Sequence, residues 1–408
     1  MTLTFDIADP RAARAAWTKI TEPADPMAGL LLRVAGPEQG LRWLLQGGNG
    51  RKLVDQFPEL EVNEKTVHHF SKVAERWQGR LEQLTPMADL AKIANLGGRF
   101  LIPSDPQWPV QLADLADLAP HGLWVLGEGN LGALGRSVAL VGCRAATSYG
   151  VHVTTNLAHE LVSHEVAVVS GGAYGIDAAA HRAALNAGGV TAAVLASGLD
   201  RWYPAGNHEI FRQMVKENIL LGEAPPGAAP SRFRFLHRNR LIAALSGVTA
   251  VVEAAHRSGA ISTANHALSL GRHLGAVPGP VTSIASEGCH RLLREGFAHC
   301  ISDASHLLEL LGPPLPGQGG LPLDIVAAED AGPGAGKPGV TAGRQQELES
   351  LGQLPALVYE NVPMRTSASA EHIASCAGLA VGETLGALGR LELHGFVRQV
   401  SGQWERIK

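Results

Sequence analysis

The chain has 408 residues, of which 45% are hydrophobic and 18% charged, and its formal net charge is −4. This length accommodates two or three domains, and the slightly acidic balance excludes a protein that coats nucleic acid through a uniformly basic surface. No apolar run approaches the roughly 20 residues of a membrane span, and the first residues lack the pattern of a secretion signal. We therefore expect a cytoplasmic protein with no membrane partner.

Residues 1–104 have the periodicity of short helices and are predicted to form a small helical domain of the helix-hairpin-helix or SAM-like kind. Within it, residues 27–46 (MAGLLLRVAGPEQGLRWLLQ) predict two helices that break at Ala35, Gly36 and Pro37. The proline then falls in the first turn of the second helix, where proline is tolerated. Nothing in this segment carries recognisable chemistry.

Residues 105–312 change to alternating strands and helices. Apolar runs of strand length occupy residues 137–142, 166–170, 191–198, 218–223, 248–254 and 275–279, and helical stretches separate them. Runs that are apolar on both faces are typical of a parallel sheet covered by helices on both sides. The fold class predicted for this segment is therefore α/β, a Rossmann-like doubly wound parallel sheet.

Two further segments follow. Residues 313–343 are rich in proline and glycine, which predicts a flexible linker. Residues 344–408 regain helical periodicity and end in an apparent hairpin, so we predict three helices and a hairpin, the elements of a C-terminal winged helix. Its third helix carries Glu383 and Glu392 against Arg390. Because that balance is poor for a major groove, partner binding or dimer support competes with duplex recognition as its role.

The four cysteines are Cys143, Cys289, Cys300 and Cys376, and no C-x-x-C is present. In a chain of this size, scattered cysteines argue against a disulfide framework and a zinc ribbon. Residues 289–300 (CHRLLREGFAHC) place a cysteine and a histidine at each end, but the spacing is wrong for known zinc sites. We predict buried thiols, no metal and no cofactor.

The stretch VVSGGAYGIDAAAHRAAL, residues 168–185, places a glycine turn between a strand and a helix. Ser170, Gly171, Gly172 and Gly175 let the chain turn tightly, and the amides of the following helix then favour an anion such as phosphate. Asp177 and His181, one turn apart and close enough to hydrogen-bond, are interpreted as structural support for the turn. A catalytic pair and a metal site are the less favoured alternatives, since no nucleophile or further ligand is evident.

Other strand ends repeat this pattern. Gly142 and Arg144 follow the first strand without forming G-x-G-x-x-G, so a dinucleotide fingerprint is missing from the sequence. Ser258, Gly259 and Ser262 lie at another turn from strand to helix. Several weak anion sites along one edge of a sheet suit a polyanion better than a single nucleotide.

Residues 231–246, SRFRFLHRNRLIAALS, contain four arginines and no acid. If their first part is extended, Arg232 and Arg234 face one way and Phe233 and Phe235 the other. The HRNR sequence then brings arginine and amide donors to the start of a helix over LIAALS. Guanidinium groups bind phosphates, and aromatic rings stack on unpaired bases. The alternative, buried phenylalanines with a solvated arginine rim, stays open.

Taken together, VALVGCRAATSYG, VVSGGAYGIDAAAHRAAL, GGVTAAVLASGLDRWYPAGNHEIF, GEAPPGAAPSRFRFLHRNRLIAALS, VVEAAHRSGAISTANHALSLGR and AVPGP resemble the DNA-processing protein A (DprA, or Smf) family over residues 105–312. The resemblance implies a homodimer that binds and protects single-stranded DNA and loads a RecA-type recombinase, as in natural transformation. Cys143 stands where the family more often has a small hydroxyl residue, and Tyr174 where many members carry lysine or arginine.

Combining motif and resemblance, the predicted DNA- and phosphate-binding residues are Arg144, Ser170, Gly171, Gly172, Tyr174, Gly175, Arg232, Arg234, Arg238, Asn239, Arg240, Ser258 and Gly259. A non-enzymatic binder is the favoured reading. One rival is a nucleotide-processing enzyme of the phosphoribohydrolase type, which needs a catalytic glutamate that the glycine turn does not supply. Another is a nuclease, which would need Asp177, Asp200, Glu223 and Glu253 to cluster around metal ions.

Overall fold

The computed structural model describes residues 5–58, 62–312, 348, 351, 353–363, 367–377, 379–400 and 402–407. The predicted linker, residues 313–343, lies outside the described residues. Among the helices that are described, each is too short or too polar to traverse a lipid bilayer.

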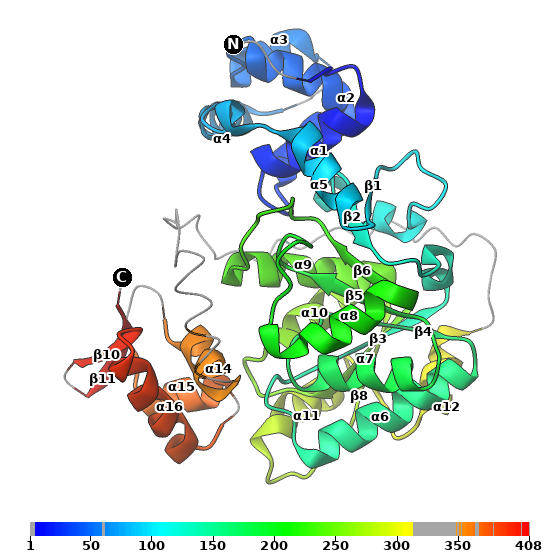
Figure 1. Ribbon diagram of the computed structural model, residues 1–408, viewed down its shortest axis with the longest axis vertical. Coiled ribbons are helices and arrows are strands. Elements are labelled where there is room, and N and C mark those ends of the chain that lie inside the picture. Colours follow the sequence, from blue (N-terminus) through cyan, green and yellow to red (C-terminus); the bar gives the residue numbers. More distant parts are fainter. Residues whose placement is uncertain are drawn as a thin grey trace.

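The N-terminal part is a bundle of helices, drawn in blue in Figure 1. Its elements are α1 (Pro10–Ile20), α2 (Pro26–Leu45), α3 (Gly50–Gln56), α4 (Glu64–Gln78), η1 (Leu81–Gln83) and α5 (Pro86–Asn95). The predicted break in the second of these is confirmed, because Gly36 has φ 74° and ψ 167° inside α2. Asp9 and Asp25 begin α1 and α2 by accepting amide hydrogen bonds at the helix ends. The core of the bundle centres on Trp17 and Trp77, which meet edge to face at 5.6 Å.

A nine-stranded sheet follows, in the order β1-β2-β6-β5-β4-β3-β7-β8-β9. The strands are β1 (Arg99–Leu101), β2 (Leu123–Leu126), β3 (Ser137–Gly142), β4 (Ala167–Ser170), β5 (Thr191–Leu195), β6 (Ile219–Gly222), β7 (Val248–Glu253), β8 (His273–Ala276) and β9 (His299–Cys300). Neighbours from β6 to β9 in this order pair in parallel, whereas β1 and β2 are antiparallel additions at one edge. The predicted α/β class with a parallel sheet is confirmed.

The sequence reading of residues 1–104 as helices alone is wrong at its end. Arg99–Leu101 form β1, which pairs with β2, and β2 was not predicted either. β1 has only three residues, whereas the apolar run of β2 (LWVL) is as long as β4 and β6 and could have been recognised. The outermost strand at this edge of the sheet, β1, is therefore built from residues before position 105.

Helices cover both faces of the sheet. They are α6 (Ser148–Ser163), α7 (Ile176–Asn186), α8 (His208–Glu217), α9 (Arg232–Leu245), α10 (Gly259–Ser269), α11 (Glu287–Arg294) and α12 (Ala304–Leu311), with 3₁₀ turns η2 (Val110–Leu118), η3 (Leu131–Gly135), η4 (Ala205–Asn207) and η5 (Ile284–Ser286). In β3, Val138 and Leu140 join the core under α6, α7 and α12, whereas Ala139 and Val141 join the core under α9, α10 and α11. This alternation explains the continuous apolar runs.

The C-terminal part contains α14 (Gln353–Asn361), α15 (Ala370–Ala377), α16 (Val381–Leu393) and the antiparallel strands β10 (Val397–Val400) and β11 (Gln403–Arg406). Leu388, Leu391 and Phe396 are fully buried among these elements, but Leu385, expected on the same side, is 45% exposed. The described part thus has the three helices and hairpin that were predicted. That these elements form a winged helix stays a prediction.

Candidate nucleic-acid interface

The strand order reverses at β3, which has β4 on one side and β7 on the other. In doubly wound sheets, ligands bind beyond the carboxyl ends of the strands at such a reversal. Glu253 occupies this place: its carboxylate accepts hydrogen bonds from the amide and hydroxyl of Thr147, the N-cap of α6, and from the thiol of Cys143 at 3.3 Å. Burial and the nearby Glu253 raise the pKa of this thiol. An internal carboxylate therefore fills the helix terminus nearest the reversal.

The glycine turn after β4 lies beside this point and leads into α7, as predicted. Its glycines are needed by the protein's own packing. A Cβ at Gly171 would lie 2.6 Å from the Arg238 guanidinium, and one at Gly175, where φ is 74°, would lie 2.3 Å from the Cys143 carbonyl oxygen. Ser170 is fully buried, and its hydroxyl donates to the Leu140 carbonyl. The glycines are thus required because Arg238 and Cys143 pack closely against the turn. At these positions the turn is not an open cradle for a phosphate.

Asp177 supports the turn, in agreement with the sequence interpretation. Its carboxylate accepts hydrogen bonds from the amides of Gly171 at 3.1 Å and Ala173 at 3.3 Å. Burial raises the pKa of Asp177, while Arg238, the two amides and Arg144 oppose that shift. The amide of Gly171, which was predicted to bind phosphate, and the amide of Ala173 therefore bind a carboxylate of the protein itself.

His181 does not hydrogen-bond to Asp177, so that part of the sequence interpretation is wrong. Its Nδ1 lies 2.8 Å from the Thr191 hydroxyl, which donates its own hydrogen to the Val168 carbonyl. Nδ1 must then carry the hydrogen, because the hydroxyl is left as an acceptor. His181 is completely buried, and desolvation lowers its pKa to about 3. It fixes α7 to β5 as a neutral ring.

The arginine-rich segment is helical from Arg232 onward, so the expected extended conformation is wrong. Ser231 is the N-cap of α9, and its hydroxyl accepts the amide hydrogen of Arg234 at 3.2 Å. Pro230 before this serine, and 14 residues without glycine or proline after it, were the signals for a longer helix. Alternation therefore fails: Arg232 and Phe233 are both exposed, while Arg234 and Phe235 are both partly buried.

Two arginines of α9 point into the protein. Arg238 donates to the carbonyls of Gly171 and Val194, and burial lowers its pKa to about 10. Arg240 is 1% exposed, pairs with Glu223 at 2.8 Å and donates to the Leu118 carbonyl. Arg238 thus places a cation directly behind the glycine turn, and Arg240 joins α9 to the sheet.

Arg144 and Phe235 lie next to this turn and are partly buried, and Tyr203 beside them is 8% exposed. The Arg144 guanidinium carbon lies 4.9 Å from the centre of the Phe235 ring, and Arg238 approaches the same ring at 5.7 Å. Tyr203 meets Phe235 edge to face at 5.7 Å. Burial lowers the pKa of Arg144, while Tyr203 and Asp177 favour its charged form. We call Arg144, Tyr203 and Phe235 the aromatic platform.

The remaining predicted residues lie around it. Tyr174 is partly exposed, and its hydroxyl accepts the Gly206 amide hydrogen at 3.4 Å. Ser258 caps α10, and the exposed Gly259, whose carbonyl accepts from Asn239 at 3.2 Å, has open space on its Cβ side. The structure therefore brings Arg144, the glycine turn and Arg238 together.

The four carboxylates suggested for a nuclease site do not cluster. Asp177 binds the turn, Asp200 pairs with Lys92 at 2.6 Å and accepts from the Gly227 amide, Glu223 pairs with Arg240, and Glu253 binds Thr147. Over the part of the chain that is described, no group of three or more histidine, cysteine, aspartate or glutamate side chains could hold a metal ion.

The sequence model of the family described as DNA recombination-mediator protein A matches residues 99–312. This is more than half of the 408-residue chain. The chain belongs to this family. A relative from Mycobacterium tuberculosis strain H37Rv, described as a putative DNA processing protein DprA, is 37% identical over 98% of this chain and 95% of its own length.

Other members of the family agree with this assignment. The DNA processing protein DprA of Streptococcus pneumoniae strain R6 is 40% identical over 47% of this chain and 67% of its own. An X-ray structure of the S. pneumoniae protein covers 75% of this chain and 98% of that chain, with 27% identity and a TM-score of 0.56. The chain is thus a DNA processing protein of the DprA and Smf type, on an α/β fold shared with a solved member.

Proposed function

We propose that this family member is a non-enzymatic, homodimeric mediator of recombination in the cytoplasm, which binds and protects single-stranded DNA and loads a RecA-type recombinase on it, as in natural transformation. The observation that carries the proposal is the aromatic platform beside the glycine turn. It combines a guanidinium group with aromatic rings, and single-strand binding uses both.

The electrostatics of the platform support binding of a strand. Arg144 lies on the platform and the buried Arg238 behind the turn, so two guanidinium groups approach the same Phe235 ring. Arg232 adds an exposed cation at the start of α9. A phosphate backbone gains from such positive charge, and unpaired bases can stack on rings that a duplex would not reach. The protein's own carboxylates already fill the two nearest amide sites, so arginines and rings are left to make the contacts.

The proposed lack of catalysis rests on the same contacts. Asp177 and Glu253 serve as helix and turn ligands, and Glu223 is buried against Arg240. A general base or a metal ligand needs access to substrate or ion, and these carboxylates are committed elsewhere.

The test measures affinity for an oligothymidylate strand and for a duplex of equal length by fluorescence anisotropy. Arg144→Glu should weaken single-strand binding by at least about tenfold, because it reverses a charge at the platform. Lys216→Glu is the matched control, since Lys216 is an exposed cation in the last turn of α8, just before the amino end of β6, whereas the glycine turn follows the carboxyl end of β4.

Equal affinity for both nucleic acids, or equal effects of both reversals, would overturn the proposal. The same preparations are assayed for filament assembly by a RecA-type recombinase on a strand coated with single-strand binding protein. They are also incubated with magnesium and with nucleoside monophosphates. Cleavage of the strand or release of a base would show that the protein is an enzyme and would contradict the proposed non-enzymatic role.

A further inference from the structure

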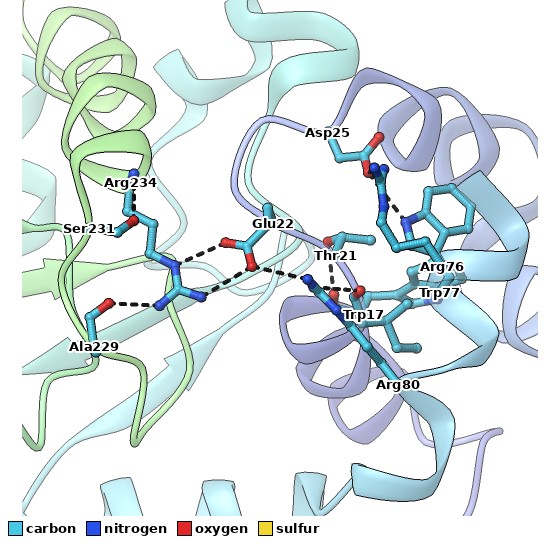
Figure 2. A network of polar contacts seen from close by, with 11 residues as sticks. Trp17, Thr21, Glu22, Asp25, Arg76, Trp77, Arg80, Ala229, Ser231 and Arg234 are labelled. Atoms are coloured by element: carbon cyan, nitrogen blue, oxygen red, sulfur yellow. Dashed lines mark hydrogen bonds and ion pairs between the residues drawn. The ribbon is translucent and has the colours of Figure 1, made fainter. Parts of the chain in front are cut away.

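An acidic side chain of the helical bundle reaches the arginine-rich helix. Glu22 lies in the connection between α1 and α2, and Figure 2 shows its carboxylate between Arg234 on one side and Arg80 on the other. Arg234 Nε and Nη2 donate to its two oxygens at 3.0 and 3.3 Å, and Arg80 Nη2 donates at 3.2 Å. Two guanidinium groups from separate parts of the chain thus share a single carboxylate.

Both arginines are held in place by backbone carbonyls as well. Arg234 Nη1 donates to the Ala229 carbonyl at 2.8 Å, and Arg80 Nη1 donates to the Ile20 carbonyl at 3.0 Å. These bonds fix the two forks without using the carboxylate. Removing Glu22 therefore leaves two oriented cations that face one point.

The shared carboxylate is open to exchange. The side chains of Glu22 and Arg80 are each 34% exposed and that of Arg234 is 21% exposed. Ion pairs that water can reach contribute little to stability, typically less than about 1 kcal/mol. A phosphodiester oxygen pair matches the same forks and carries the same charge.

The position of the pair points to nucleic acid as that ligand. Arg234 belongs to the first turn of α9, between the exposed Arg232 and the platform residue Phe235. Arg234 directly precedes the platform residue Phe235 in α9, so a strand that crosses the platform passes close to this turn. Two arginines against one glutamate also leave a surplus positive charge for it.

We infer that Arg80 and Arg234 form a second phosphate site, shared by the helical bundle and α9, which Glu22 fills in the free protein and a DNA backbone phosphate takes over on binding. The inference rests on the proposed binding of single-stranded DNA. It makes the helical bundle a contributor to that interface, with Glu22 as the internal competitor.

The experiment compares Glu22→Gln with Glu38→Gln in the full chain. Glu38 is a matched control because it also belongs to the helical bundle and pairs with one exposed arginine, Arg42, at 2.9 Å. Glu22→Gln should tighten oligothymidylate binding about fivefold at low salt, beyond any effect of Glu38→Gln. The slope of log affinity against log salt should steepen by about 0.7. Without the charge of Glu22, one more protein cation is available to release a counterion from the DNA.

Second substitutions test whether the gain in affinity comes from Arg80 and Arg234. Adding Arg80→Gln or Arg234→Gln to Glu22→Gln should abolish the gain, and an oligonucleotide with uncharged methylphosphonate linkages should not detect it. If Glu22→Gln fails to fold, as judged by thermal unfolding, Glu22→Ala replaces it.

An affinity that is unchanged or weaker in the Glu22 variant, relative to Glu38→Gln, would overturn the inference. Should Arg144→Glu still abolish binding in that case, the proposed function stands and only the second site fails. Should neither variant alter binding, the proposed function itself fails.

Discussion

Both the first turn of α9 and its following turns carry arginines, but these arginines differ in burial and in their partners. In the first turn, Arg232 is exposed and Arg234 pairs with Glu22 at a surface that water reaches. Two turns later, Arg238 and Arg240 are 6% and 1% exposed and bind carbonyls and a carboxylate inside the protein. The degree of burial therefore separates the arginines proposed to contact phosphate from the structural ones.

The difference also teaches how the surface is built. The inner arginines fix the glycine turn and the position of α9, and the outer ones are those proposed to contact DNA. A substitution in the inner half should change stability first, and a substitution in the outer half should change affinity alone. The predictions below test this separation, from the largest expected effect to the smallest.

Arg240→Leu should lower the free energy of unfolding by about 3–5 kcal/mol, because it leaves Glu223 charged and buried without its partner. Urea unfolding followed by circular dichroism measures the loss. Adding Glu223→Leu should restore most of the stability, since the uncompensated charge is then gone. A single variant as stable as the wild type would contradict the structural role of Arg240.

Arg238→Met should cost about 2–3 kcal/mol of stability, because two charge-assisted hydrogen bonds to buried carbonyls are lost. It should also weaken single-strand binding by roughly tenfold, since the glycine turn loses its support and a positive charge behind it. Unfolding and anisotropy are measured on the same preparation. A loss of affinity without a loss of stability would show that Arg238 contributes to binding and not to the structure.

Acid should destabilise the protein through its buried histidines. The pKa of His181 is lowered to about 3 in the folded protein. Between pH 6.5 and 3, this histidine therefore binds a proton in the unfolded chain but stays neutral in the folded chain. Stability must then fall with falling pH, by up to about 1.4 kcal/mol per unit for this group. His181→Asn should flatten the dependence in urea unfolding, and the exposed His69→Asn serves as control. A slope that both variants share would contradict the assignment.

Arg232→Gln should give the smallest effect. This exposed side chain should contribute about a two- to threefold loss of single-strand affinity and a salt slope shallower by about 0.7, with stability unchanged. Anisotropy titrations at several salt concentrations, with unfolding in parallel, measure both. A drop in stability similar to that of Arg238→Met would remove the distinction between the two halves of α9.

Much of the fold could be predicted because local pattern and burial agree. The runs at 137–142 and 248–254 are apolar on both faces, and they became β3 and β7 in the middle of the sheet. The glycine turn was predictable for a similar reason, since a strand, glycines and a first-turn acid follow one another directly.

The rest depends on contacts between distant residues. The alternation of arginine and phenylalanine over residues 232–235 resembled an extended strand. Ser231, however, is the N-cap of a helix that begins at Arg232. The partners Glu223 of Arg240 and Glu22 of Arg234 lie 17 and 212 residues away along the chain. Sequence spacing alone gives no sign of either pairing, so it could not tell which arginines stay at the surface.

The carboxylate of Glu253 at the reversal of the sheet has one more consequence. Many proteins of this architecture bind a nucleotide there. Here a phosphate group entering the same crevice would meet fixed negative charge on the first turn of α6. The proposed binding of single-stranded DNA should accordingly be unchanged by added nucleoside triphosphate.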